Sequence, residues 1–213
     1  GYRFNQPIEN VKWPESLQVI QFDEEFNHPV EKVKWPDSLQ IIHFRGDFNQ
    51  PIEKVKWPSF LKTITFGHEF NKPIENIHWP DSLKTIKFGY KFNKPVNNLP
   101  KYLTHLKFNY YFNQPVDNLP KSLTNLKFGN NFNRSVDNLP ESLTSLKFGN
   151  NFNQPLDKWK DKLINVESIS NMFNGAIGFN QKIGSWDVSN VTHMENTFKY
   201  SGIRSPVLWC PES

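Results

Sequence analysis

The chain of 213 residues is poor in cysteine, in long apolar segments and in catalytic motifs. Its single cysteine, Cys210, excludes an internal disulfide framework and a zinc cluster built on cysteines. No run of about 20 apolar residues is present, so no membrane-spanning helix is expected, and no N-terminal segment has the pattern of a signal peptide. The GxSxG, HExxH, P-loop and GxGxxG motifs are also missing. We therefore expect a non-enzymatic protein with no cofactor, no catalytic residue and no metal site.

The composition favours few, large core side chains. Hydrophobic residues make up 37% of the chain, below the usual share of about 45–50%. However, there are 19 Phe and 7 Trp, and Pro is raised at 16 residues. The formal net charge of +4 is mild. It is compatible with an acidic partner and does not require nucleic acid.

A short internal repeat organises most of the chain. The Phe-Asn pair recurs at a spacing of 22 residues, which then shortens to 20. A period this short cannot hold two helices, and it suits one solenoid coil with a strand and a tight return. Frequent prolines in the return segment disfavour helix there. The eight pairs begin at Phe4, Phe26, Phe48, Phe70, Phe92, Phe112, Phe132 and Phe152.

The segment around Leu123, Leu126 and Phe128 is the candidate strand of its coil. Its LxxLxF spacing is the one that leucine-rich repeats use for a stacked parallel strand, with Asn125 and Lys127 facing outward. We therefore predict a mainly β protein, a right-handed leucine-rich-repeat-like β-solenoid with one parallel sheet of about nine strands and little helix. The strands are expected to start near Leu17, Leu39, Leu61, Leu83, Leu103, Leu123, Leu143, Leu163 and Val191.

The asparagine of each Phe-Asn pair is the same in all eight coils, which implies one shared local role. Asparagine carries two donors and an acceptor on a short stem. Stacked at one strand spacing, it can bond turn backbone and its own neighbours, while the adjacent phenylalanines form an aromatic spine. We expect a structural ladder, rather than a ligand site, made of Asn5, Asn27, Asn49, Asn71, Asn93, Asn113, Asn133 and Asn153.

The repeat resembles a known family. The units FNQPIENVKWPESLQVIQFDEE (4–25) and FNQPVDNLPKSLTNLKFGNN (112–131) are similar to the FNIP repeats of social amoebae and giant viruses, and this resemblance covers residues 1–158. Residues 179–198, FNQKIGSWDVSNVTHMENTF, resemble a bacterial-surface-protein repeat of leucine-rich character. We therefore divide the chain into an FNIP array (1–158), divergent coils of the same solenoid (159–202) and a tail (203–213) that caps the last coil or serves as a docking peptide.

Outward-facing strand positions are the candidate interaction residues. In successive coils one outward column reads Lys87, Lys107, Lys127 and Lys147. Such a column is either a solvated face that resists aggregation or a basic stripe for an acidic protein segment. Nucleic acid is disfavoured because the stripe has little Arg and no interleaved aromatic platform.

Two outward histidines, His43 and His105, are also candidate partner-binding residues. They belong to the second and fifth coils, about 14 Å apart, so they cannot share a metal ion. A repeated carboxylate column (Glu9, Glu31, Glu53, Glu75, then Asp117, Asp137 and Asp157) marks a solvated face balanced by neighbouring lysines, with calcium as the weaker alternative.

The FNIP resemblance implies interaction rather than catalysis, because such arrays often follow an F-box or a kinase domain. The predicted function is a protein-interaction module that recruits substrates for an F-box-type ubiquitin-ligase adaptor. The alternative is a cell-surface or virion-surface adhesion repeat. A glycan at the Asn133-Arg-Ser sequon would break the ladder. We therefore expect the protein to lie in the cytoplasm, where such sequons are not glycosylated. No membrane partner is expected.

Overall fold

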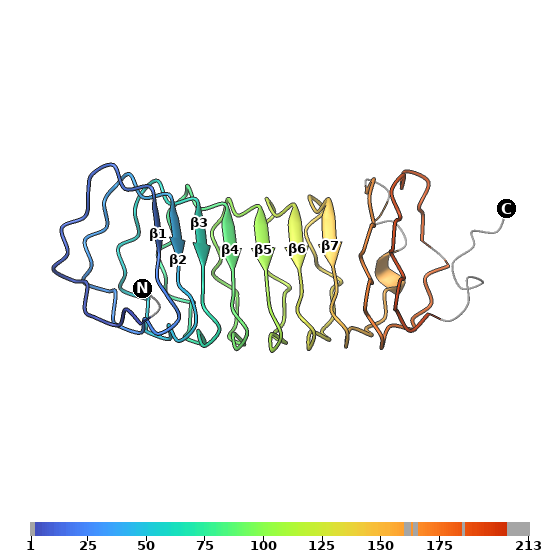
Figure 1. Ribbon diagram of the computed structural model, residues 1–213. Helices are drawn as coiled ribbons and strands as arrows, with labels where there is room; N and C mark the ends of the chain where they lie inside the picture. Colours follow the sequence, from blue (N-terminus) through green and yellow to red (C-terminus); the bar gives the residue numbers. More distant parts are fainter. Residues whose placement is uncertain (1–2, 160–162, 164–165, 185, 204–213) are drawn as a thin grey trace.

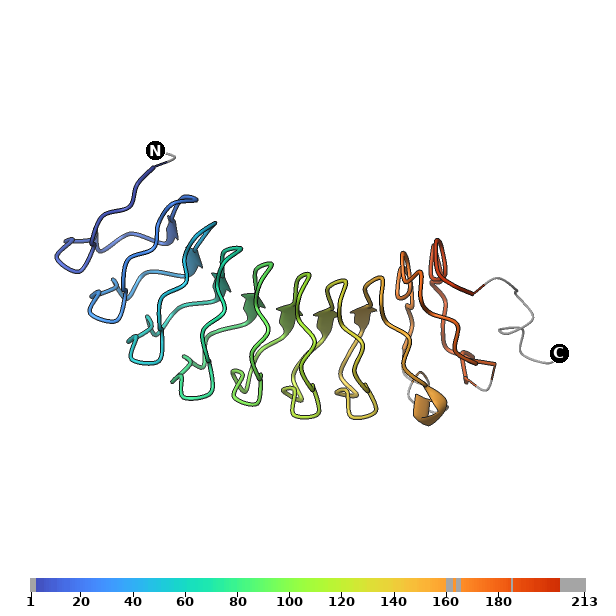
Figure 2. The same ribbon diagram turned by 90° about the horizontal axis from the view of Figure 1, so that it is seen from below.

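A computed structural model describes residues 3–159, 163, 166–184 and 186–203. The coils stack along one axis into a curved rod, with the first and last coils at opposite ends (Figures 1 and 2). The fold is the leucine-rich-repeat-like β-solenoid that the repeat predicts. Its elements are β1 (Val19–Gln21), β2 (Ile41–His43), β3 (Thr63–Thr65), β4 (Thr85–Lys87), β5 (His105–Lys107), β6 (Asn125–Lys127), β7 (Ser145–Lys147) and the 3-10 turn η1 (Asp157–Trp159).

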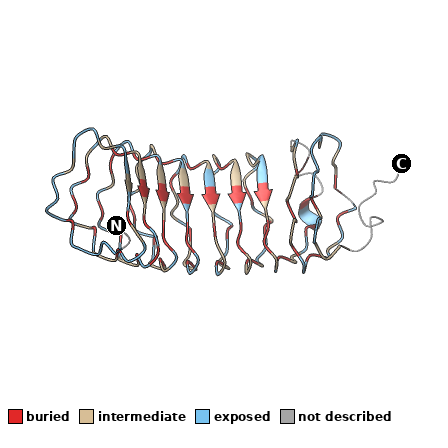
Figure 3. Cartoon of the chain, viewed as in Figure 1, coloured by how far each residue is buried: buried red, intermediate tan, exposed pale blue. Residues whose placement is uncertain are grey.

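The seven strands form one parallel sheet in sequence order, so each coil pairs only with its neighbours. Each strand has three residues, and its central residue points into the core, as Ile86 and Leu106 do where they pair. In Figure 3 the buried colour therefore follows the middle of each of the strands β2 to β7. Because side chains alternate along a strand, the first and third residues face outward.

The sheet lines the concave side of the rod, and the return segments fan out on the convex side (Figure 2). Hydrogen bonds hold neighbouring strands about 4.8 Å apart. On the return segments, the rings of Trp13 and Trp35 lie 6.0 Å apart and those of Trp57 and Trp79 6.1 Å apart. The phenylalanine rings of the core have a similar spacing, as Phe44 and Phe66 do at 6.1 Å. Both columns of rings are therefore spaced more widely than the strands.

The core contains the expected aromatic spine. Within a coil, the rings of Phe128 and Phe132 stack at 3.7 Å, and between coils Phe132 stacks on Phe112 and on Phe152 at 6.1 Å each. Phe132 is completely buried. The same pairing recurs in the last coils, where Phe173 stacks on Phe179 at 4.0 Å. Few, large side chains therefore fill each coil, as the composition indicated.

The expected number of nine strands is wrong, because the described part of the chain contains seven. In the last two coils a single parallel bridge joins Ser168 to His193. Backbone bonds continue from Ile169 and Asn171 to the next coil, but Asn171 has a φ of 62°, which turns the chain out of extended geometry. Of the tail proposed as a cap (203–213), only Ile203 is described, and it packs against the core.

Candidate protein-interaction surface

The lysine column is assembled by the register of the sheet. Lys87, Lys107, Lys127 and Lys147 are the third residues of β4 to β7 and pair with one another in that order. Each follows a buried residue of its own strand, so each points out of the concave face. Lys87 and Lys127 are exposed, and Lys107 and Lys147 are half-buried. We define these four residues as the lysine column.

A groove of about 400 Å³ runs over β4 to β7 on this face. Its outward side chains come from two rows, the lysine column and the first residues of the same strands. The first row is short and polar. Its members are Thr85, His105, Asn125 and Ser145. The groove lining contains no carboxylate and continues to Ser170 and Asn171.

The electrostatics of the groove favour a negatively charged occupant. Partial burial, and then the ammonium groups of Lys127 and Lys87, lower the pKa of Lys107 below its ordinary value. Within the described ranges, no carboxylate lies at ion-pair distance from the lysine column. Carboxylates from a partner would offset this repulsion, because opposite charges favour the protonated ammonium form.

The two candidate histidines lie in different places. His105 is the first residue of β5, lines the groove and lies 2.9 Å through Nδ1 from the Thr104 hydroxyl. His43 is the third residue of β2 and lies outside the residues that line the groove. Burial, and then the charges of Lys87 and Arg45, lower the pKa of His43. Among the residues that the structure describes, no three His, Cys, Asp or Glu side chains could hold a metal ion together.

A tyrosine cluster beside the lysine column was missed from the sequence. Tyr90 stacks on Tyr110 at 4.8 Å, and Tyr111 meets both rings edge-on at 5.2 and 5.1 Å. Tyr90 lies in the turn after β4, three positions after Lys87. Tyr110 and Tyr111 lie in the turn after β5, three and four positions after Lys107. The sequence does contain a signal for this cluster, because the equivalent loop positions of the neighbouring coils carry acidic, His or Asn residues and no tyrosine. Tyrosine is a frequent anchor of protein interfaces.

The repeat asparagines form a ladder that joins the coils. The side-chain oxygen of Asn49 accepts the backbone N–H of Asn71 at 3.0 Å, and Asn71 accepts that of Asn93 at 3.0 Å. The same bond joins every pair of successive coils from Asn5 to Asn153, at 2.9–3.1 Å. It continues from Asn153 to Asn180. These side chains are committed to backbone groups, so the ladder sets the geometry of the surface.

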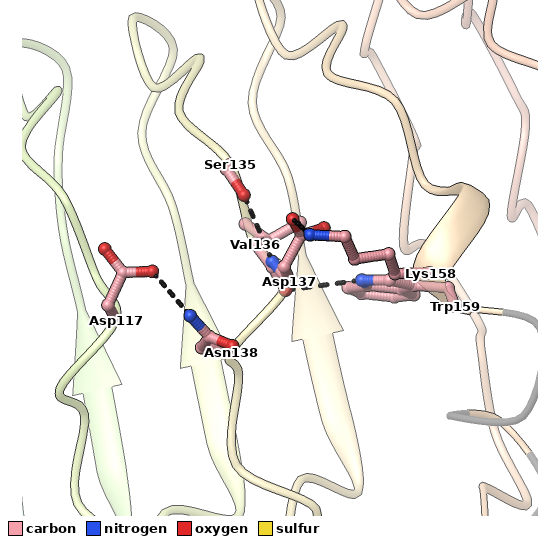
Figure 4. A network of polar contacts seen from close by, with 7 residues as sticks. All are labelled: Asp117, Ser135, Val136, Asp137, Asn138, Lys158 and Trp159. Atoms are coloured by element: carbon pink, nitrogen blue, oxygen red, sulfur yellow. Dashed lines mark hydrogen bonds and ion pairs between the residues drawn. The ribbon is translucent and has the colours of Figure 1, made fainter.

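The carboxylate column lies on the return segments, and neighbouring coils contact two of its members, Asp117 and Asp137 (Figure 4). Lys158 contacts Asp137 at 2.8 Å, and the Asn138 amide donates to Asp117 at 3.0 Å. Trp159 donates its indole N–H to the Val136 carbonyl at 3.3 Å. The hydrogen bond from Lys158, and then the charge of Asp137, raise the pKa of Lys158. Asp137 therefore has a lysine partner within the protein, whereas no carboxylate of the described residues pairs with the lysines of the groove.

Within the described ranges, no helix has the length and apolar character needed to cross a membrane.

The solenoid and its outward columns define the class of protein as a repeat protein of the leucine-rich-repeat type. Comparison with known families agrees. The FNIP repeat model matches residues 4–47 and 48–91, and the model described as "Mycoplasma protein of unknown function, DUF285" matches residues 88–203, over half of the chain. The chain therefore belongs to the DUF285 family, and its first coils match the FNIP repeat. The two matches meet where the repeat shortens from 22 to 20 residues.

A solved structure has the same fold. The crystal structure of CroV588, described as a novel circular LRR protein, is 37% identical with a TM-score of 0.74. The match covers 91% of this chain and 29% of that one, so this chain spans less than a third of its length. A leucine-rich repeat protein from Bacteroides ovatus is 17% identical over 87% of this chain and 47% of its own, with a TM-score of 0.28. No curated protein matches the sequence.

Proposed function

We propose that this chain is a protein-interaction module whose partner binds the concave face of the sheet through an acidic segment. The observation that carries the proposal is the groove over β4 to β7, lined by four lysines and no carboxylate. The tyrosine cluster beside it adds rigid aromatic side chains of the kind that anchor interfaces. Charge complementarity would set the partner and speed its association.

The finer role we propose is recruitment of substrates to an F-box-type ubiquitin-ligase adaptor in the cytoplasm. Its support is the resemblance of the repeats to FNIP arrays, which often follow an F-box. The alternative role is a surface or adhesion repeat, supported by the resemblance of residues 179–198 to a bacterial-surface-protein repeat. Antibody labelling of intact cells or virions separates the two, because only the second role places the repeats on the surface.

Crosslinking tests the binding face directly. The chain would be incubated with amoeba lysate and treated with a carbodiimide, which activates carboxylates and joins them to lysine amines as amides, and mass spectrometry would identify crosslinked peptides. We expect partner peptides joined to the lysine column, and loss of the partner with the variant K87S/K107S/K127S/K147S. A matched control, K32S/K34S/K54S/K56S, removes four exposed lysines from the return segments and should keep the partner. Equal capture by both variants would overturn the proposed face.

A further inference from the structure

The spacing of the lysine column constrains what can lie along it. Successive strands lie about 4.8 Å apart, so Lys87 and Lys147, three strands apart in the sheet, are separated by about 14 Å. An α-helix rises about 1.5 Å per residue, which places positions i and i+10 about 15 Å apart along its axis. Positions i, i+3, i+7 and i+10 share one face of a helix. Four side chains on such a face therefore match four lysines.

We infer that the partner segment is an α-helix that lies along the lysine column, with carboxylates at positions i, i+3, i+7 and i+10. Each carboxylate then faces one lysine ammonium group. This inference rests on the proposed function and specifies the conformation and charge pattern of its partner.

The shape of the groove agrees with a helix. The two outward rows are separated by two residues of strand, about 6.7 Å. The first row, which includes Thr85, Asn125 and Ser145, is short, while the lysines of the third row are long. A helix about 10 Å across can rest over the short row with its acidic flank toward the lysines. Lys107 and Lys147 are half-buried members of that third row.

Other acidic polymers fit the same face less well. In an extended strand, side chains on one side lie about 6.7 Å apart, so four carboxylates would span about 20 Å and pass out of register with the lysines. Single-stranded nucleic acid is held by aromatic rings on which its bases stack. The residues that line the groove include no Phe, Tyr, Trp or Arg.

Fluorescence anisotropy with four synthetic probes tests the inference. The first probe is a capped helical peptide of about 18 residues with glutamates at i, i+3, i+7 and i+10. The second has the same composition with the glutamates distributed around the helix, and the third keeps the first pattern but has two central prolines. The fourth is an oligothymidylate of equal charge. The proteins are the native chain and the two lysine variants named above, with circular dichroism to confirm their folding.

We expect the first peptide to bind at least about tenfold more tightly than the second and third, since four ordered ion pairs act together. That binding should be lost in the variant of the lysine column and kept in the control variant. Equal binding of all three peptides, dependent on the lysine column, would overturn the helical register and leave the proposed function standing. Preferential binding of the oligothymidylate would overturn both. If no peptide binds, the inference fails, and the crosslinking experiment decides the proposed function independently.

Discussion

The backbone N–H of Asn180 donates to the side-chain oxygen of Asn153 at 3.1 Å, although 27 residues separate them instead of 20 or 22. The bond is the same as those that join the shorter coils. It persists where the repeat sequence changes and where the regular strands have ended. The asparagine ladder therefore fixes how coils stack, while the length of the return segment varies around it.

The ladder predicts a specific cost for losing one rung. Asn71→Ala leaves the half-buried backbone N–H of Asn93 without its acceptor, so the free energy of unfolding should fall by about 1–2 kcal/mol. Urea denaturation followed by circular dichroism measures this. The comparison is Asn76→Ala, an exposed asparagine outside the ladder, which should change stability by less than about 0.5 kcal/mol. Equal effects of both substitutions would show that the rung adds nothing.

The phenylalanine spine should be the most sensitive part of the core. Phe132→Ala removes a completely buried ring that stacks on three others, and about 3–5 kcal/mol of stability should be lost. Phe60→Ala is the matched control, because Phe60 is 61% exposed. Thermal unfolding should show a large shift for the first variant and almost none for the second. A similar shift for both would contradict a core built on stacked rings.

Close stacking of coils explains one repeated glycine. A Cβ on Gly129 would overlap the Asn109 carbonyl oxygen of the preceding coil, so that backbone must move. We expect Gly129→Ala to cost about 1–3 kcal/mol, as overpacking does. At Gly178 the nearest atom would be 3.5 Å away, which is ordinary contact, so Gly178→Ala should be tolerated. Urea midpoints of the two variants provide the test, and a stable Gly129→Ala protein would refute the tight approach.

The stability of the chain should depend on pH through His43. Its pKa is lowered in the folded state by burial, Lys87 and Arg45, whereas the unfolded chain has the ordinary value near 6.5. Below that pH the unfolded state binds more protons, so this residue's contribution to stability falls as the pH falls. His43→Gln should therefore gain stability relative to the native chain between pH 7.5 and pH 5.5.

Urea midpoints at the two pH values measure that difference, and His78→Gln, at an exposed position, provides the comparison. If the His43 variant followed the native chain at both pH values, the histidine would carry no such penalty in the folded protein.

The repeat, the class of fold and the outward columns could be predicted from the sequence. The strand pattern recurs in each regular coil, so the alternation around Leu126 was enough to place Lys127 outside and Phe128 inside. The remaining features arise from the folded arrangement of the coils. The positive φ of Asn171 ends the extended geometry, so the regular sheet has seven strands in the described part of the chain, and the stacked coils curve toward that sheet (Figure 2). The groove without carboxylates and the cluster around Tyr110 also arise between coils, because they depend on which residues of neighbouring turns come together.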